Sequence, residues 1–239
     1  MYQNYIFDLY GTLIDIHTNE KKTYLWEKLC EFYRFHGADY ETKELRQTYE
    51  SLCKKYLSES SSYTYPEIQI EDVFEDLFTQ KNVHITKELA MYTGQFFRIL
   101  STSYVRLYDG VIPLLTSLKE QGGHIYVLSN AQRIFTAYEM KHLGIYDLFD
   151  GIVLSSDEGC MKPDPEFFQI VLDRYQLSKK DSIMIGNDAV SDIEGAANAG
   201  IDSLYLHSNL SPAITSKLKS TYSIMDLDLE KAKHILLDH

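Results

Sequence analysis

Five short apolar runs, spread along the chain, constrain its fold more than any other feature of the sequence. Each run is continuous rather than alternating and is rich in residues that favour strands. Continuous runs of this length are typical of strands covered on both faces. Helical patterns separate the last four runs, so the sequence predicts parallel βαβ units in a doubly wound α/β sheet. The runs lie at residues 5–7, 125–128, 152–154, 183–185 and 204–206.

The stretch between the first run and the second is too long for a single crossover helix. Apolar residues recur at helical spacing throughout residues 17–101. A serine-rich segment at 58–62 predicts a loop within this stretch. We therefore expect two domains: residues 1–16 and 102–239 form the catalytic core, and residues 17–101 form a helical cap, or lid, inserted after the first strand.

Composition and charge narrow the possible partners. The chain has 239 residues, of which 44% are hydrophobic, and a net charge of −12. This charge argues against nucleic acid, which is bound by clustered Lys and Arg. Nothing near Met1 resembles a secretion signal, and no apolar run approaches the ~20 residues of a membrane-spanning helix. Cys30, Cys53 and Cys160 match no zinc spacing and are expected to be reduced thiols. We expect a cytoplasmic protein with a small-molecule substrate and neither a nucleic-acid nor a membrane partner, and leave its oligomeric state open.

Polar residues end several of the predicted strands. Asp8 ends the first, Ser129 and Asn130 end the second, and Asn187 and Asp188 follow the fourth. In parallel sheets of this kind, ligands bind beyond the carboxyl ends of the strands. These side chains are therefore predicted to converge on one edge of the sheet.

Four sequence motifs carry these polar residues. They are FDLYGTLID at 7–15, VLSN at 127–130, GCMKPDPEFF at 159–168 and IGNDAVSD at 185–192. In this order and spacing they resemble the haloacid dehalogenase (HAD) superfamily of hydrolases. The resemblance covers roughly residues 1–16 and 102–210, and the helical segment matches the position of that family's lid. It implies a Rossmann-like core in which Asp8 is the nucleophile.

The charge of the nucleophile indicates a cation. A carboxylate that attacks phosphorus approaches an anion, so charge must be neutralised. Mg²⁺ held by Asp8 and Asp188 would do this, because Mg²⁺ favours one or two carboxylates together with waters and a substrate oxygen. The resemblance implies the backbone carbonyl of Tyr10 as a further ligand. Lys162 is a catalytic candidate, because its ammonium can reach both the nucleophile and a phosphoryl oxygen.

Five further residues are candidates for contact or support. Ser129 as a catalytic residue and Asn130 as a substrate-binding residue are predicted to donate hydrogen bonds to the transferred group; alternatively Ser129 only caps the next helix. Thr12 shapes the turn and is a candidate contact to the nucleophile or substrate. Asn187 stands where the family usually has an acidic residue, and we expect it near the metal without direct contact. Asp192 is expected to act through a water or the lysine, or only to favour the N-terminus of its helix.

The residue two positions after Asp8 separates two chemistries. In the family's phosphatases it is normally a second Asp, which protonates the leaving alkoxide; here it is Tyr10. A phenol, with a pKa of about 10, can donate a proton but is a poor base at neutral pH. Tyrosine at this position resembles the DxYGT motif of the 2-haloacid dehalogenases, in which halide leaves without a proton. Asp188 departs from that pattern, however, and neither Arg34 nor Arg46 matches the arginine that binds substrate there.

These features predict a hydrolase with an Asp nucleophile. We expect a Mg²⁺-dependent phosphatase, a phosphomonoesterase or phosphotransferase, that acts on a small phosphorylated metabolite through an aspartyl-phosphate. It would favour good leaving groups, or move protons with a lid residue or with the substrate itself. The alternative is a metal-independent 2-haloacid dehalogenase that forms an aspartyl ester. A third possibility is a phosphate- or metabolite-binding module with little turnover.

Overall fold

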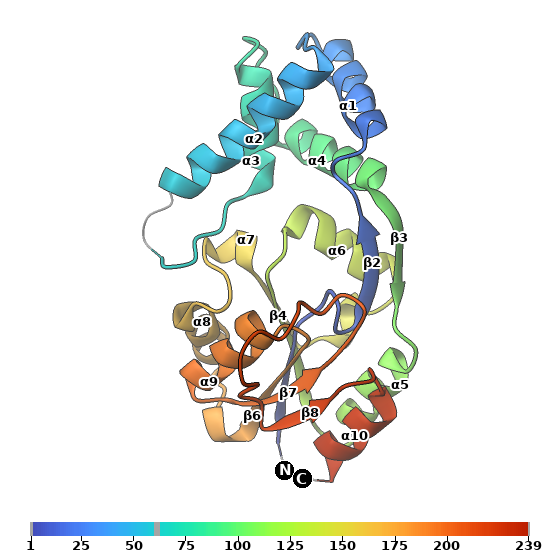
Figure 1. The fold of residues 1–239 in the computed structure, drawn as a ribbon, viewed down its shortest axis with the longest axis vertical. Helices are drawn as coiled ribbons and strands as arrows, with labels where there is room; N and C mark the ends of the chain where they lie inside the picture. The colour runs from blue at the N-terminus through green and yellow to red at the C-terminus, as the bar shows by residue number, and fades with distance from the viewer. Residues whose placement is uncertain (1, 60–62, 239) are drawn as a thin grey trace.

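Six parallel strands form the central sheet, in the order β5-β4-β1-β6-β7-β8 (Figure 1). The computed structural model describes residues 2–59 and 63–238. All neighbouring strands in this sheet run parallel, which confirms the predicted doubly wound α/β fold. The strands are β1 (Asn4–Phe7), β4 (His124–Ser129), β5 (Gly151–Leu154), β6 (Ser182–Gly186), β7 (Asp202–Leu206) and β8 (Tyr222–Ile224).

All five predicted apolar runs lie in strands, whereas the edge strand β8 was not predicted. Strand β8 is three residues long, and only Ile224 in it is buried. A strand without a continuous apolar run gives no signal of the kind that identified the others.

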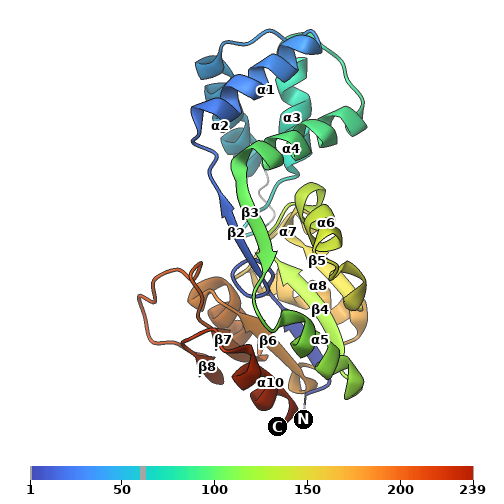
Figure 2. The same cartoon turned by 90° about the vertical axis from the view of Figure 1, so that its right-hand side faces the viewer.

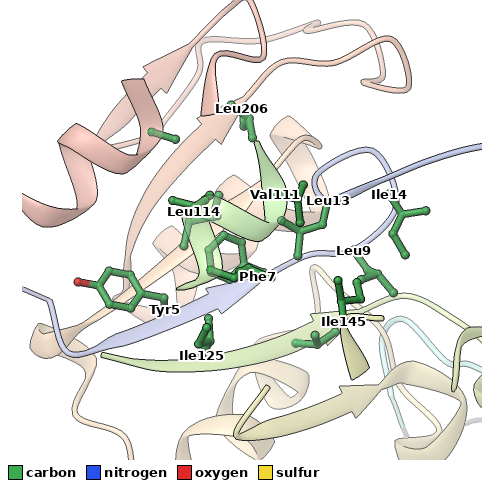
Figure 3. Close-up of a cluster of buried hydrophobic side chains, with 14 of the residues drawn as sticks. Tyr5, Phe7, Leu9, Leu13, Ile14, Val111, Leu114, Ile125, Ile145 and Leu206 are labelled. Atoms are coloured by element: carbon green, nitrogen blue, oxygen red, sulfur yellow. The ribbon is translucent and has the colours of Figure 1, made fainter. Parts of the chain in front are cut away.

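Helices cover both faces of the sheet. They are α5 (Val111–Glu120), α6 (Arg133–His142), α7 (Ser155–Glu158), α8 (Pro165–Tyr175), α9 (Gly195–Ala199) and α10 (Leu229–Leu237), with short turns η1 (Tyr146–Leu148), η2 (Lys179–Asp181) and the π-helical η3 (Ala189–Glu194). Tyr5 and Phe7 of β1 pack in one buried cluster with α5 and α10 (Figure 3). Ile6 points to the other face and packs in a cluster with α8. Because both faces are buried, β1 carries no polar residue between its apolar ones.

A two-stranded antiparallel ribbon connects the sheet to four further helices (Figure 2). The ribbon consists of β2 (Ile14–Thr18) and β3 (Thr102–Leu107), and the helices are α1 (Thr23–Phe35), α2 (Thr42–Glu59), α3 (Ile70–Thr79) and α4 (Lys87–Ser101). These helices have their own buried cluster, which includes Tyr33, Phe74 and Phe97. We refer to α1–α4 as the cap.

Two local predictions for the cap segment are wrong. The chain is not helical from residue 17, because β2 continues to Thr18 with Ile14 and Ile16 buried against β3. Of the loop expected at 58–62, Ser58 and Glu59 instead lie in α2, which runs through Glu59, and residues 60–62 lie outside the described residues. The domain boundaries at 16/17 and 101/102 stay a prediction.

Among residues 2–59 and 63–238, no helix has both the length and the apolar character that crossing a membrane requires.

Candidate active site

Asp8 lies directly after β1, at the carboxyl edge of the sheet, where its backbone amide donates to the carbonyl of Ile185 (2.9 Å). Its side chain is largely buried. Oδ1 accepts hydrogen bonds from Ser129 Oγ (3.0 Å) and Lys162 Nζ (2.8 Å). Oδ2 accepts a longer bond from Thr12 Oγ1 (3.3 Å). One carboxylate oxygen is thus fixed by two donors, and the other is held more weakly.

Lys162 is a buried ammonium between two carboxylates. Its Nζ lies 2.8 Å from Asp8 Oδ1 and 2.7 Å from Asp192 Oδ1. Burial by itself would lower the pKa of Lys162, but the carboxylates of Asp192 and Asp8 outweigh it and raise the pKa. Burial and the charge of Asp8 together raise the pKa of Asp192, because one ammonium cannot compensate two buried carboxylates.

Asn130 fixes the backbone of the lysine. Its Oδ1 accepts from the amide of Lys162 (2.8 Å), and its Nδ2 donates to the carbonyl of the same residue (2.9 Å). This pair of bonds joins the end of β4 to the loop before α8. Contact between Asn130 and substrate stays a prediction, and it would have to use the remaining hydrogen of the amide.

Asn187 packs against the turn after the nucleophile. Its Oδ1 accepts a hydrogen bond from Thr12 Oγ1 (3.3 Å). Gly11 has a φ of +87°, and a Cβ on it would lie 2.3 Å from Asn187 Nδ2. Only glycine fits this backbone and this contact together.

Asp188 begins the π-helical turn η3. Its Oδ1 accepts from the amides of Val190 (2.8 Å) and Ser191 (3.1 Å), as an N-cap does. Both bonds end on the same oxygen, which leaves Oδ2 for a cation. The amide of Asp188 in turn donates to Asp192 Oδ2 (2.9 Å), so Asp192 contacts both the lysine and the backbone of this loop.

Eight of the nine predicted site residues line one cavity of about 200 Å³. The ninth, Thr12, is buried and bonded to Asp8. Three further residues that line the cavity, Ser191, Leu210 and Pro212, were not predicted. Leu210 and Pro212 come from a loop after β7 that carries no motif. The eight residues are Asp8, Tyr10, Ser129, Asn130, Lys162, Asn187, Asp188 and Asp192.

The phenol of Tyr10 is bonded to helix α6. Its hydroxyl donates to the carboxylate of Glu139 and lies 3.0 Å from Thr136 Oγ1. Burial, reinforced by the charge of Glu139, raises the pKa of Tyr10. Glu139 also forms an ion pair with Arg98 of cap helix α4 (2.6 Å). These partners were not predicted, because single residues on helices give no motif.

A second and larger cavity, of about 390 Å³, lies between α4, β3 and α6. Arg98 and Glu139 line it, but none of the predicted site residues does. The motif residues line the smaller of these two cavities. We assign the chemistry to that cavity because it contains the predicted site residues.

Hard oxygen donors suit this cavity to a Mg²⁺ ion. Asp8, Asp188 and Tyr10, whose carboxylates and backbone carbonyl are the predicted ligands, all line it. Across the described residues, no three His, Cys, Asp or Glu side chains form a group that could hold a metal by themselves. Mg²⁺ does not need such a group, since it is commonly bound by one or two carboxylates with waters and substrate oxygens.

Known proteins match this chain in sequence. The profile of the haloacid dehalogenase-like hydrolases matches residues 2–200. YfnB of Bacillus subtilis is 28% identical over 148 residues, which are 62% of this chain and 61% of YfnB. The glyceraldehyde 3-phosphate phosphatase of Methanothermobacter thermautotrophicus is 30% identical over 135 residues, 55% of this chain and 59% of that protein. Each alignment spans less than two thirds of the relative's own length.

Solved structures share the fold at low identity. Magnesium-bound YfnB superposes with a TM-score of 0.57 at 21% identity and covers 98% of both chains. A dehalogenase superposes with a TM-score of 0.59 at 16% identity and covers 100% of this chain and 98% of its own. Fold, motif order and family profile agree, and the chain belongs to the haloacid dehalogenase-like hydrolases.

Proposed function

We propose that the protein is a Mg²⁺-dependent phosphatase that cleaves small phosphorylated metabolites through an aspartyl-phosphate on Asp8. One observation carries the proposal: three carboxylates, of Asp8, Asp188 and Asp192, line a small cavity with a single ammonium, that of Lys162. Such a site has excess negative charge and attracts a cation. A cavity with a cation and an ammonium suits a phosphoryl group.

Asp8, Asp188 and the carbonyl of Tyr10 would hold the ion. When bound, Mg²⁺ supplies positive charge that lets an anionic nucleophile meet an anionic phosphoryl group. The magnesium bound to YfnB supports this assignment for the related fold.

The chain's own residues would divide the reaction as follows. Oδ2 of Asp8, the less tightly bonded oxygen, forms the bond to phosphorus while the bond from phosphorus to the leaving oxygen breaks. Ser129 and Lys162 hold Oδ1 and so orient the attack. Water then hydrolyses the aspartyl-phosphate, which yields inorganic phosphate and restores Asp8.

The named relatives support hydrolysis of phosphoryl groups without fixing a substrate. The Methanothermobacter relative is a glyceraldehyde 3-phosphate phosphatase, and a relative from Halalkalibacterium halodurans is a pyrophosphatase. The second candidate, metal-independent dehalogenation, is favoured by Tyr10, since halide departs without a proton.

We infer a cytoplasmic location from the three free cysteines.

Phosphate release with Mg²⁺, and again with excess EDTA, tests the proposal. We expect Mg²⁺-dependent release that Asp8→Asn abolishes. Asp188→Asn should raise the Mg²⁺ concentration for half-maximal rate by at least about tenfold, since even groups beside metal ligands are worth 10–100-fold in affinity. Asp173→Asn, on the exposed face of α8, is the control. Release that EDTA leaves unchanged would refute the metal assignment.

The same preparation assayed with 2-chloropropionate separates the alternatives. Chloride release that is insensitive to EDTA would establish carbon–halogen cleavage instead. If neither phosphate nor chloride appears, while phosphate still raises the melting temperature, the protein is a binding module.

A further inference from the structure

The phenol of Tyr10 is bonded to groups outside the catalytic cavity. Its acceptor, Glu139, and its neighbour Thr136 both belong to α6, and neither lines the cavity of Asp8. The guanidinium of Arg98 lies over the Tyr10 ring, 5.6 Å from its centroid. The hydroxyl thus joins a cluster that links the nucleophile loop to the cap, and two members of this cluster, Arg98 and Glu139, line the second cavity.

Glu139 is the centre of this cluster. Oε1 accepts from Arg98 Nε (2.6 Å), while Oε2 accepts from Tyr10 and, at 3.3 Å, from Arg98 Nη2. The side chain is 12% exposed, so the carboxylate obtains its hydrogen bonds largely from these two residues. Hydrogen bonds to a buried carboxylate are among the strongest in proteins. The phenol of Tyr10 thus donates its hydrogen to a residue that does not line the catalytic cavity.

The other titratable side chains of the catalytic cavity are bonded to one another or assigned to other roles. The described lining residues include five that titrate: Asp8, Tyr10, Lys162, Asp188 and Asp192. Asp8 is the nucleophile and Asp188 is the proposed metal ligand. Lys162 donates one N–H group to Asp8 and another to Asp192. Asp192 accepts a hydrogen bond on each oxygen, from Lys162 and from the amide of Asp188. None of these lining residues comes from the cap, and a lid residue as the proton donor stays a prediction.

We propose that Glu139 is a positioning residue that keeps the Tyr10 phenol out of catalysis, and that the site consequently takes substrates whose leaving group departs as a stable anion. The chemical class is acyl phosphates, phosphoric anhydrides and aryl phosphates, in preference to alkyl phosphates. In each case the bond between Asp8 and phosphorus forms, the bond to the leaving oxygen breaks, and that oxygen keeps the electron pair. Its proton, where it takes one, comes from bulk water afterwards. This inference rests on the proposed phosphatase function.

Alkyl phosphates should react poorly for a quantitative reason. An alkoxide is a strong base and needs a proton as it leaves, and a positioned acid is worth roughly 10²–10⁴-fold in rate. A carboxylate, a phosphate or a nitrophenolate leaves without this help. We therefore expect kcat/KM for acetyl phosphate and 4-nitrophenyl phosphate to exceed that for ethyl phosphate by at least about 10²-fold.

The experiment measures kcat/KM with Mg²⁺ for a series of aryl phosphates, acetyl phosphate and ethyl phosphate. Tyr10→Phe should change all rates by a similar factor, because the phenol takes no part in proton transfer. Glu139→Ala should release the phenol and reduce the aryl-to-ethyl rate ratio by roughly tenfold, a part of what a positioned acid supplies. Glu139→Gln keeps an acceptor oxygen for the phenol and should retain the wild-type ratio.

Glu158→Ala is the matched control. Glu158 is 14% exposed, pairs with Arg174, and lines neither cavity. Its loss should leave the rate ratio unchanged. Equal wild-type rates for ethyl and aryl phosphates would overturn the inference and leave the phosphatase intact, as would a Tyr10→Phe effect confined to ethyl phosphate. If Glu139→Ala and Glu139→Gln both change the rates with all substrates by the same factor, Glu139 has only a structural role. If no substrate releases phosphate, the proposed function itself is refuted.

Discussion

The turn that follows the nucleophile depends on one residue without a side chain. At Gly11 a Cβ would be strained by the backbone, whose φ is +87°, and would also lie 2.3 Å from Asn187. Gly144 has a similar φ of +71°, but nothing lies within 4 Å of its Cβ position. Substitutions at these two positions therefore distinguish the cost of backbone strain, which both share, from the cost of steric contact, which only Gly11 has.

We expect Gly11→Ala to destabilise the protein more than Gly144→Ala does. A left-handed backbone costs a non-glycine residue roughly 1–2 kcal/mol, and both variants bear that cost. Gly11→Ala must in addition displace Asn187, and overpacking of this kind costs about 1–3 kcal/mol. Urea unfolding of the two variants measures the difference, and equal stabilities would show that Asn187 moves freely.

At the active site, the sequence could predict residues but not their partners. Asp8 and Asp188 follow strands, and the carboxyl ends of parallel strands meet at one edge of the sheet. The bonds between Asn130 and the backbone of Lys162 depend on how two loops meet, and no spacing encodes that. The Glu139 partner of Tyr10 lies on a helix 129 residues further on and belongs to no motif.

At the scale of elements, the connection between α2 and α3 binds the core as well as the cap. We call described residues 63–69 of this connection the strap. Its backbone bonds the core at Gly159 and Met161, with distances of 3.0 and 2.9 Å. Asp164 Oδ2 accepts from the amides of Thr64 and Tyr65 at 3.1 and 3.3 Å. The strap thus holds the loop that carries Lys162 from the side opposite the β2–β3 ribbon.

Gln132 is the side chain that ties the strap to α6. Its Oε1 accepts from the amide of Ile70 (3.0 Å), and its Nε2 donates to the carbonyl of Ile68 (2.9 Å). We expect Gln132→Ala to speed amide hydrogen exchange in residues 63–70, because two hydrogen bonds between cap and core are lost, each worth about 0.5–1.5 kcal/mol. Gln169→Ala, which removes an exposed glutamine bonded to Asp173, should leave that exchange unchanged. Unaltered exchange in Gln132→Ala would mean that backbone bonds alone hold the strap.

The sequence predicted the elements of this region better than their connections. Apolar spacing identified a helical segment because each helix buries one face in a shared cluster. The strap has no apolar periodicity, and its order comes from hydrogen bonds to loops about 60–100 residues away in the sequence. Contacts of this kind depend on the folded arrangement and leave no local pattern.

At the scale of the whole molecule, Asp15 joins the ribbon to the cavity wall. It lies on β2, is 3% exposed, and accepts hydrogen bonds from Arg106 and Tyr104 of β3. It also accepts a bond of 3.0 Å from Asn209 Nδ2, and the next residue, Leu210, lines the catalytic cavity. One carboxylate therefore connects both strands that lead to the cap (Figure 2) with the loop that borders the site.

This arrangement predicts an acid-dependent stability. Burial by itself would raise the pKa of Asp15, but the hydrogen bonds that it accepts outweigh burial and hold the pKa below its usual value. A lowered folded-state pKa means that the stabilisation is complete above the usual aspartate value of about 3.9 and is lost as the pH falls through the lower folded value.

We expect the melting temperature of the wild type to fall more steeply between pH 5 and pH 3 than that of Asp15→Asn, which cannot ionise at this position. Asp226→Asn, at an exposed pair with Lys231, is the control and should keep the wild-type slope. Parallel curves for the wild type and Asp15→Asn would show that the ionised carboxylate of Asp15 does not hold the ribbon and the cavity loop together.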